Sequence, residues 1–223
     1  VMIRQFVSFQ ENAALFDQEQ RRRRLAEALS QAARTLSTSL DYQAVPPLVL
    51  DQLALVVPYE RCSIMLRQEK HLFIAAQRGF PADKRTTELR IEIKPDDNYL
   101  VLESSRQPLV LPDVTQVPGW TIVPWLPLNK AWMGVPLESG EDVIGMISLT
   151  RREANAFTPE DANQALAFAG PAAIALENAR LYQELSQAYR IVETLDRTKS
   201  RFIEIVAHEL RTPLTVIKGY SQT

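Results

Sequence analysis

The sequence predicts an α+β fold, in which a six-stranded antiparallel sheet is flanked by helices and followed by a long C-terminal helix. Two observations lead to this prediction. Apolar residues recur every three or four positions before about residue 57 and after residue 158, but every second position between residues 61 and 151. The helical segments therefore flank the strands along the chain instead of alternating with them, which favours an α+β domain over a doubly wound sheet.

Two helices are expected before the sheet. Residues 18–40 contain neither Gly nor Pro, and their leucines and alanines recur at helical spacing, so we assign them to an N-terminal linker helix. A run of four arginines within this segment covers a full helical turn and is interpreted as a solvated helix face. Asp41 then caps a second helix that continues to about Val57 and ends before Pro58. Residues 1–17 form a leader without a predicted structure.

Six short segments with period-two alternation predict the strands. They are Arg61–Arg67, Leu72–Gln77, Glu88–Ile93, Pro108–Leu111, Ala131–Glu138 and Asp142–Thr150. The turn Glu138–Asp142 joins the last two segments as a hairpin, which indicates antiparallel pairing. The segment Lys94–Lys130 contains six prolines and two of the three tryptophans, and we expect it to be the least regular part of the domain.

The pattern from Thr158 onward is helical, and Thr158, Pro159 and the two acids that follow form a helix start signal. Beyond residue 180 a heptad seam steps by four and three positions through Leu181, Leu185, Ala188, Val192, Leu195, Lys199, Phe202 and Val206. A lone helix cannot cover such a stripe, so the seam predicts a parallel dimeric coiled coil. At 1.5 Å per residue, residues 180–220 would extend roughly 60 Å. We assign residues 181–200 to this coiled-coil signalling helix.

Composition narrows the possible functions. The chain has 25 Lys and Arg against 27 Asp and Glu, a net charge of −2, so no global field attracts nucleic acid or an anionic membrane surface. A single cysteine, Cys62, excludes an internal disulfide framework, and the histidines are only His71 and His208, so no self-contained zinc site is expected. No apolar run is long enough for a spanning helix, and a cytoplasmic location is expected. The first and last residues suggest a piece of a longer parent.

The most specific string in the chain is Phe202–Leu214, which reads FIEIVAHELRTPL. It resembles the phosphoacceptor helix of sensor histidine kinases, called HisKA or DHp, in which an apolar run precedes His-Glu-Leu-Arg-Thr-Pro-Leu. The resemblance implies that His208 is the phosphoacceptor and that residues 201–223 are the first part of a dimerisation and phosphoacceptor domain.

A more diffuse resemblance covers about residues 24–184, which are similar to a GAF domain; we assign residues 41–180 to this sensor domain. It is carried by a first strand, a last hairpin and an exit helix, at Arg61–Leu66, Trp132–Leu137 with Ile144-Gly145, and Ala175–Tyr182. A match at the level of the fold says little about the ligand.

The residue types around His208 fit phosphoryl transfer. A neutral imidazole nitrogen is needed for attack, and the usual histidine pKa near 6.5 leaves much of it neutral. Glu209 can accept a hydrogen bond from the other ring nitrogen, which orients and activates the histidine. The resemblance assigns a phosphatase role to Thr212, which would position a water. Pro213 lacks an N–H and is expected to bend the helix, with simple helix termination as the alternative.

The resemblance further implies the reaction and partners of the parent protein. His208 would accept the γ-phosphoryl group of Mg-ATP held by an ATP-binding domain, and pass it to an aspartate on the receiver domain of a response regulator. Counterparts of the second hairpin helix and of the ATP-binding domain do not precede Thr223, so the chain alone is expected to be an inactive part of a histidine kinase. The expected partners are a second copy, that domain and the regulator, without nucleic acid.

A candidate ligand pocket lies between the predicted sheet and the Lys94–Lys130 segment. Tyr99, Trp120, Trp125 and Trp132 concentrate aromatic surface there, as in many small-molecule sites. The alternative is that these rings fill the core.

Specific ligands can be compared with the available residues. Cys62 lies on a predicted strand, which argues against a bilin thioether and for a small buried hydrophobe. His71 lies in a turn and is expected to be exposed, which argues against haem ligation. The cyclic-nucleotide signature of GAF domains is met at Phe157–Asp161, but Arg151-Arg152 replaces its Asn-Lys pair, so a cyclic nucleotide is not expected. The GAF ligand therefore stays unassigned.

Two functional hypotheses follow. The first is the sensory and phosphoacceptor portion of a two-component histidine kinase. The second is a GAF dimerisation and spacer module that senses nothing itself. A transcription factor with a GAF input is a weaker third, because no basic recognition helix follows.

Overall fold

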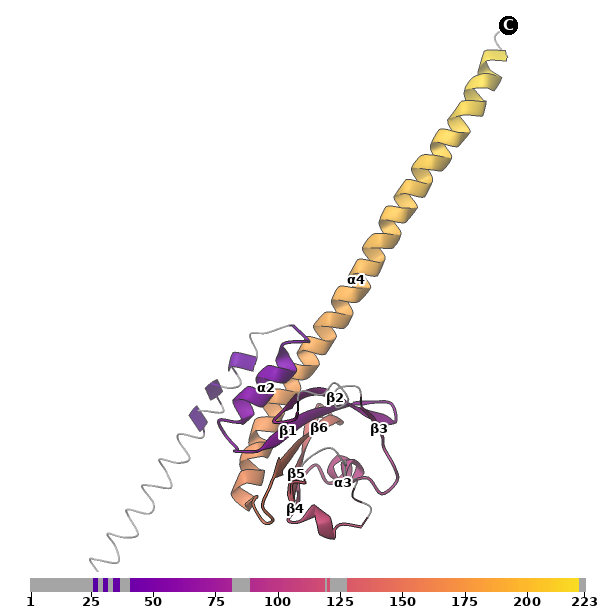
Figure 1. The fold of residues 1–223 in the computed structure, drawn as a ribbon. Helices are drawn as coiled ribbons and strands as arrows, with labels where there is room; N and C mark the ends of the chain where they lie inside the picture. The colour runs from indigo at the N-terminus through magenta and orange to yellow at the C-terminus, as the bar shows by residue number, and fades with distance from the viewer. Residues whose placement is uncertain are drawn as a thin grey trace, which may run out of the picture. The chain divides into compact units, whose positions relative to one another are not determined.

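The computed structural model describes residues 26–27, 30–31, 34–36, 41–81, 89–118, 120 and 128–220, and for residues 204, 205 and 207–220 it describes the helical backbone alone (Figure 1). The predicted leader, the arginine run and most of the linker helix lie outside these residues. The described residues of the linker segment are helical, and Leu36 among them is buried. The chain divides into two compact units, Val1–Ala179 and Arg180–Thr223, called here the N-terminal and C-terminal units.

The N-terminal unit contains a six-stranded sheet, as predicted. Its strands are β1 (Arg61–Gln68), β2 (His71–Arg78), β3 (Arg90–Glu92), β4 (Leu109–Leu111), β5 (Ala131–Ser139) and β6 (Asp142–Arg151). Their spatial order is β3-β2-β1-β6-β5-β4, and every neighbouring pair is antiparallel. The two edge strands have three residues each, so β3 is shorter than the predicted Glu88–Ile93.

The β5–β6 hairpin is confirmed, with Ser139 paired to Asp142 across a two-residue turn. Gly140 in this turn has a φ of +61°, a conformation that glycine adopts without steric cost. Alternation along β5 separates its two faces. Met133 and Val135 enter one core cluster, whereas Trp132 enters the other.

One face of the sheet is covered by α2 (Val45–Leu53) and by the start of α4 (Pro159–Tyr220). The helix α2 is shorter than predicted, because its N-cap is Ala44 and it ends at Leu53. Asp41 instead forms a turn before the helix, where its carboxylate accepts a hydrogen bond from the Gln43 N–H at 2.9 Å.

The other face is covered by α3 (Asn98–Ser105) and a short 3₁₀ turn at Val114–Gln116. The sequence predicts an irregular segment here and does not predict α3. This single short helix has Asp97 as its N-cap, which accepts a hydrogen bond from the Tyr99 N–H at 2.9 Å, and it ends where Arg106 has a φ of +53°. The sheet therefore lies between two helical layers.

The helix α4 starts at the predicted signal. Thr158 Oγ1 accepts a hydrogen bond from the Asp161 N–H at 3.1 Å, and the Asp161 carboxylate accepts one from the Thr158 N–H at 2.8 Å. This reciprocal capping box satisfies two donors that the first turn leaves open. Up to Ala179 the helix buries a face rich in alanine against the sheet, with Phe168 wholly buried within it.

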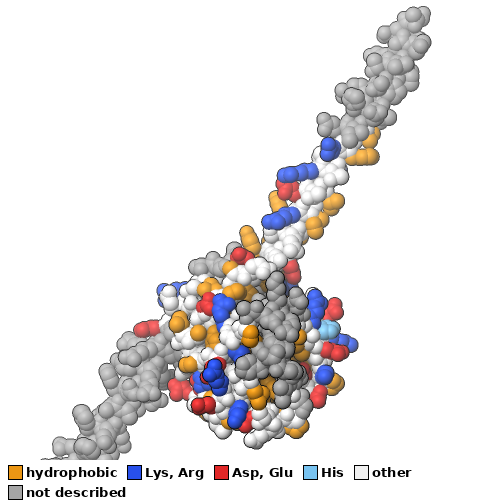
Figure 2. Space-filling view, in the orientation of Figure 1, with side chains coloured by type: hydrophobic (Ala, Val, Ile, Leu, Met, Phe, Trp, Pro, Cys, Tyr) orange, Lys and Arg blue, Asp and Glu red, His pale blue; other side chains and the backbone are white. Residues whose placement is uncertain are grey.

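The C-terminal unit is the remainder of α4, which continues as helix to Tyr220. Large apolar side chains are exposed along it, next to charged ones (Figure 2). Among the described side chains of this unit, the large exposed hydrophobic ones are Leu181, Tyr182, Leu185, Tyr189, Ile191, Val192, Leu195, Phe202 and Ile203.

Candidate functional site

The predicted phosphoacceptor residues all lie on the helical backbone of α4. His208 and Glu209 are followed one turn later by Thr212, so the first and third share a helix face by their spacing of four. The helix continues through Pro213 for seven further residues. Pro213 therefore does not terminate it, and the predicted bend stays a prediction. The side chains of these four residues lie outside the described part of the chain.

The predicted heptad seam is open to solvent in the single chain. Leu185 is 67% exposed, Leu195 is 63% exposed and Phe202 is 65% exposed. The backbone of this unit satisfies its own hydrogen bonds as a helix, but the apolar stripe finds no cover within the unit. Dimerisation through it stays a prediction.

Three aromatic residues of the candidate pocket, Tyr99, Trp120 and Trp132, form part of the second core cluster. Tyr99 is fully buried, and its hydroxyl donates to the Val143 carbonyl at 2.8 Å. The indole N–H of Trp132 donates to Ser148 Oγ at 2.8 Å. Trp120 packs edge-to-face on Trp132, with ring centroids 5.5 Å apart. The Tyr99 hydroxyl and the Trp132 indole N–H therefore already have hydrogen-bond acceptors within the protein. Burial raises the pKa of the Tyr99 hydroxyl.

Trp125 lies outside the described residues. A ligand-lining role for Trp120, Trp125, Trp132 and Tyr99 stays a prediction.

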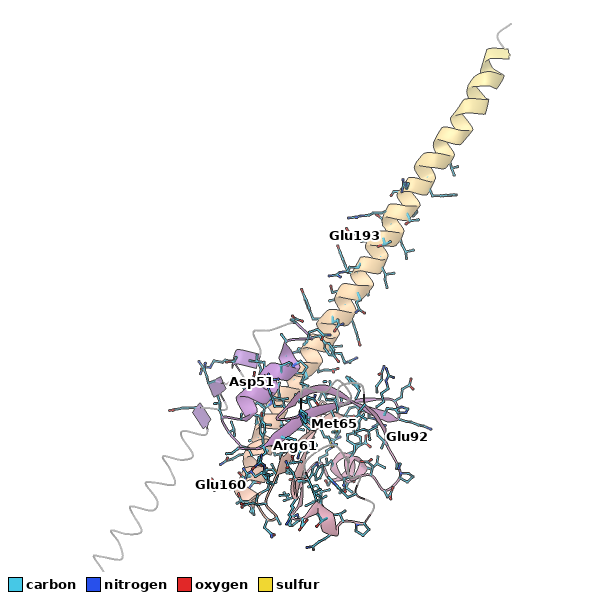
Figure 3. The ribbon with its side chains drawn as sticks, in the orientation of Figure 1. Asp51, Arg61, Met65, Glu92, Glu160 and Glu193 are labelled. Atoms are coloured by element: carbon cyan, nitrogen blue, oxygen red, sulfur yellow. The ribbon has the colours of Figure 1, made fainter. Side chains whose placement is uncertain are left out.

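Sequence reasoning missed a buried polar network on the same sheet. The Arg61 guanidinium, on β1 in Figure 3, donates through Nη2 to Asn129 Oδ1 at 2.7 Å. Asn129 in turn donates to Thr150 Oγ1 at 2.8 Å. Phe80 also lies 5.8 Å from the guanidinium carbon. Burial, together with the charge of Arg152, lowers the pKa of Arg61. An arginine at the start of a strand gives no sequence signal of such burial.

The cofactor expectations can be placed in the structure. Cys62 is fully buried on β1, and burial raises the pKa of its thiol, as expected for a small buried hydrophobe. His71 is the first residue of β2 and is exposed, as predicted. Within the described residues, no group of three His, Cys, Asp or Glu side chains is placed to hold a metal ion.

The residues that partly match a cyclic-nucleotide signature have structural partners. The Arg151 guanidinium packs 4.5 Å from the centre of the Phe157 ring and contacts the Asp161 carboxylate at 3.4 Å. Arg151 also donates to the Pro58 carbonyl at 2.6 Å. This cluster ties the end of β6 to the start of α4.

Among the helices of the described part, none has the length and apolarity needed to cross a membrane.

Comparison with family models identifies the globular part. The GAF domain model matches residues 39–177, more than half of the chain. The chain belongs to the GAF domain family. The model of the His Kinase A phospho-acceptor domain matches residues 198–223, which include His208. A GAF domain followed by this phosphoacceptor domain forms a sensor histidine kinase signalling module, and the second domain points to histidine kinase activity in the parent protein. No curated protein matches the chain.

Solved structures agree on the GAF fold. The GAF domain of a phosphoenolpyruvate-protein phosphotransferase from Coxiella burnetii superposes with a TM-score of 0.63 at 18% identity, covering 72% of this chain and 96% of that one. Free methionine-R-sulfoxide reductase from Neisseria meningitidis, solved with its substrate, gives 0.58 at 19% identity, covering 70% and 90%. The bacteriophytochrome RpBphP3 of R. palustris gives 0.59 at 12% identity, covering 78% and 41%. At these identities the likeness concerns the fold alone.

Proposed function

We propose that this chain is the sensory and phosphoacceptor portion of a two-component histidine kinase, with His208 as the phosphorylated residue. The observation that carries the proposal is the phospho-acceptor match over residues 198–223, centred on the His-Glu-Leu-Arg-Thr-Pro-Leu string. A supporting observation is that the helix bearing His208 starts inside the GAF domain, at Pro159.

In the proposed reaction, a neutral ring nitrogen of His208 attacks the γ-phosphorus of Mg-ATP held by a separate ATP-binding domain. An N–P bond forms, the bond from the γ-phosphorus to the bridging oxygen breaks, and ADP leaves. The proton on the other ring nitrogen is held by Glu209, which stabilises the positive charge that develops on the ring. A carboxylate oxygen of the regulator then attacks the phosphorus and regenerates the imidazole.

The proposed signal path is the helix itself. The start of α4 forms part of the GAF core, through residues such as Phe168 and Leu176, so a change in that core acts on the same helix that bears His208. The chain pairs with a second copy through the exposed seam of the C-terminal unit. Signal binding or partner binding would change the geometry of this pair and thereby the access to His208.

The acceptor assignment is tested by phosphorylation in trans. The purified chain is mixed with radiolabelled ATP and the ATP-binding domain of a related kinase, and label on the chain is measured. We expect label on the wild type and none on His208→Gln. His71→Gln is the matched control, because it removes the other histidine of the chain at an exposed position. Label that survives in His208→Gln contradicts the assignment.

The role of Thr212 is tested separately. In the complete kinase, Thr212→Ala is expected to slow dephosphorylation of the regulator at least about tenfold while leaving autophosphorylation within about twofold. Equal loss of both activities would show that Thr212 supports the helix and not the attacking water.

One observation favours the second hypothesis, a spacer that senses nothing. The Tyr99 hydroxyl and the Trp132 indole N–H already donate to Val143 and Ser148 inside the protein. Native mass spectrometry of the protein purified from its host distinguishes the two hypotheses: a bound small molecule supports sensing, and its absence at every growth condition tested supports the spacer.

A further inference from the structure

The apolar stripe of the C-terminal unit is wider than one heptad seam. Between residues 181 and 203, the first seam defined by the sequence runs through Leu181, Leu185, Ala188, Val192, Leu195, Lys199 and Phe202. Four large apolar residues outside it are just as exposed: Tyr182 at 53%, Tyr189 at 72%, Ile191 at 61% and Ile203 at 56%. A two-stranded coiled coil built on the first seam leaves these side chains at its margin.

A second seam is completed by Tyr182, Tyr189 and Ile203, whereas Ile191 lies outside both seams. The second seam runs through Tyr182, Leu185, Tyr189, Val192, Asp196, Lys199 and Ile203, again in steps of three and four. The two seams share Leu185, Val192 and Lys199. They differ at the positions that they do not share. At each of these the second seam contains the next residue along the chain: 182 instead of 181, 189 instead of 188, 196 instead of 195 and 203 instead of 202.

The geometry of the helix relates the two seams. Successive residues are about 100° apart around the helix axis, so positions 181 and 182 lie on opposite sides of the shared row. The centres of the two seams are therefore separated by about 50° of rotation. A pair of helices can pass from one seam to the other by each turning about its own axis while the shared row stays between them.

We propose that the C-terminal unit pairs with a second copy of this chain through either of two alternative seams, which gives the dimer two rotational settings. This inference rests on the proposed function, since it supplies the two-state element that the signal would bias.

The repeat itself identifies the partner as a second copy. Both seams keep the seven-residue period, so a parallel helix with the same repeat meets every layer of either seam in register. Apart from Ile191, the positions between 181 and 203 that lie outside both seams are polar. Ion pairs Arg180–Glu184 at 2.6 Å and Arg197–Glu193 at 2.6 Å also lie outside the seams, with Glu193 labelled in Figure 3.

Opposing contributions keep the two settings close in stability. The first seam is the more apolar, but it sets Lys199 among hydrophobic layers without a seam residue of opposite charge. The second seam contains Asp196 one layer away from Lys199, so each lysine of the pair has a carboxylate on the partner helix within the interface. Tyr182 and Tyr189 lie inside the interface in the second setting and at its margin in the first. Tyrosine suits both places, because the ring is apolar and the hydroxyl can stay in water.

Disulfide cross-linking of the full 223-residue chain tests the inference. Single cysteines are placed at Leu195 and Phe202 for the first seam and at Asp196 and Ile203 for the second. Native Cys62 can remain, because it is fully buried. Two cysteines more than about 7 Å apart at Cα do not form a disulfide without backbone movement, so a dimer fixed on the first seam will not join the second-seam positions.

We expect cross-linking at positions of both seams, with rates within about fivefold of each other, and rates at least about tenfold lower for cysteine at Glu193 or Arg197. Fast cross-linking at Leu195 and Phe202 with only the background rate at Asp196 and Ile203 overturns the inference and leaves the dimer and the phosphoacceptor assignment intact. A monomer in sedimentation refutes the dimer in the proposed function as well.

Two variants shift the balance in opposite directions. Ala188→Leu enlarges a layer of the first seam alone, and we expect it to lower the second-seam to first-seam cross-linking ratio at least about threefold, on the order expected for a buried methylene group or two. Leu195→Ala shrinks a layer of the first seam alone and is expected to raise the ratio, read from cysteines at positions 202 and 203. Glu193→Leu, off both seams, is the matched control and should leave the ratio unchanged. An unchanged ratio in both seam variants contradicts two interconverting settings.

Discussion

The two parts of α4 present the same amphipathic pattern with opposite outcomes. Between Pro159 and Ala179 the apolar face is covered by the sheet, and Phe168 is 0% exposed. Beyond Arg180 the apolar face is open, and Leu185 is 67% exposed. Both parts are helical in the single chain, one with its apolar face covered and the other with its apolar face open. Burial depends on a partner, which the first part finds within the chain.

The residue types on the two faces differ for a related reason. The covered face is rich in alanine, with Ala165, Ala169, Ala172 and Ala173 buried, so the helix can lie close to the sheet. The open face has large side chains, such as Leu195 and Phe202, at heptad spacing. Large side chains at that spacing can insert as knobs into the holes on the surface of a second helix.

The largest effect is expected where the covered face is emptied. Phe168→Ala should reduce the free energy of unfolding of the N-terminal unit by about 3–5 kcal/mol, because the wholly buried ring leaves a cavity. Urea denaturation followed by tryptophan fluorescence measures this, since all three tryptophans lie in that unit. Phe202→Ala is the matched control on the open face and should leave this transition unchanged. Equal destabilisation by both variants would remove the contrast between the two faces.

A charge on the open face should act on association instead. Leu185 belongs to both seams, so Leu185→Asp is expected to raise the dissociation constant of the dimer at least about a hundredfold, through one charge buried on each helix. Sedimentation equilibrium measures it. Gln187→Asp adds the same charge outside both seams and should have little effect. A dimer insensitive to Leu185→Asp is held together elsewhere.

Two glycines compare a filled environment with an open one. A Cβ on Gly134 would lie 2.3 Å from the Trp132 ring and 2.8 Å from Leu102, whereas a Cβ on Gly170 in α4 would meet no atom within 4 Å. Gly134→Ala should therefore cost about 1–3 kcal/mol of stability of the N-terminal unit by overpacking. Gly170→Ala should change it by less than about 1 kcal/mol. Thermal and urea unfolding measure both, and a reversed order would mean that the second core cluster is loosely packed around Trp132.

The smallest effect is expected at the start of α4. Thr158→Ala removes one half of the capping box and should destabilise the N-terminal unit by about 1 kcal/mol. Thr194→Ala is the control, because Thr194 Oγ1 only donates to the Arg190 carbonyl within the helix at 2.8 Å. Urea denaturation should separate the two variants, and a neutral Thr158→Ala would indicate that packing alone determines where α4 begins.

The strands and the start of α4 could be predicted because their signals are local. Alternation places Met133 and Trp132 on opposite faces, and the Thr-Pro-Glu-Asp string contains its own capping partners. The helix α3 escapes prediction because it has only eight residues between proline-rich segments, although Asp97 before it is a recognisable cap. The prediction that Asp41 caps this helix is wrong. Asp41 forms a turn before the helix α2, and that helix begins later, with a proline in its first turn, where a missing backbone N–H breaks no helical hydrogen bond.

The sequence alone determined the alternation of the six strands, the spacing of the apolar residues along the C-terminal unit and the motif around His208, because each depends on residues a few positions apart. Only the tertiary structure decided that Arg61 is buried against Asn129, 68 positions away, and that the Tyr99 hydroxyl donates to Val143, 44 positions away. These contacts exist because the fold packs α3 and the residues before β5 against strands that are distant in the sequence, and no local pattern encodes which buried polar group meets which partner.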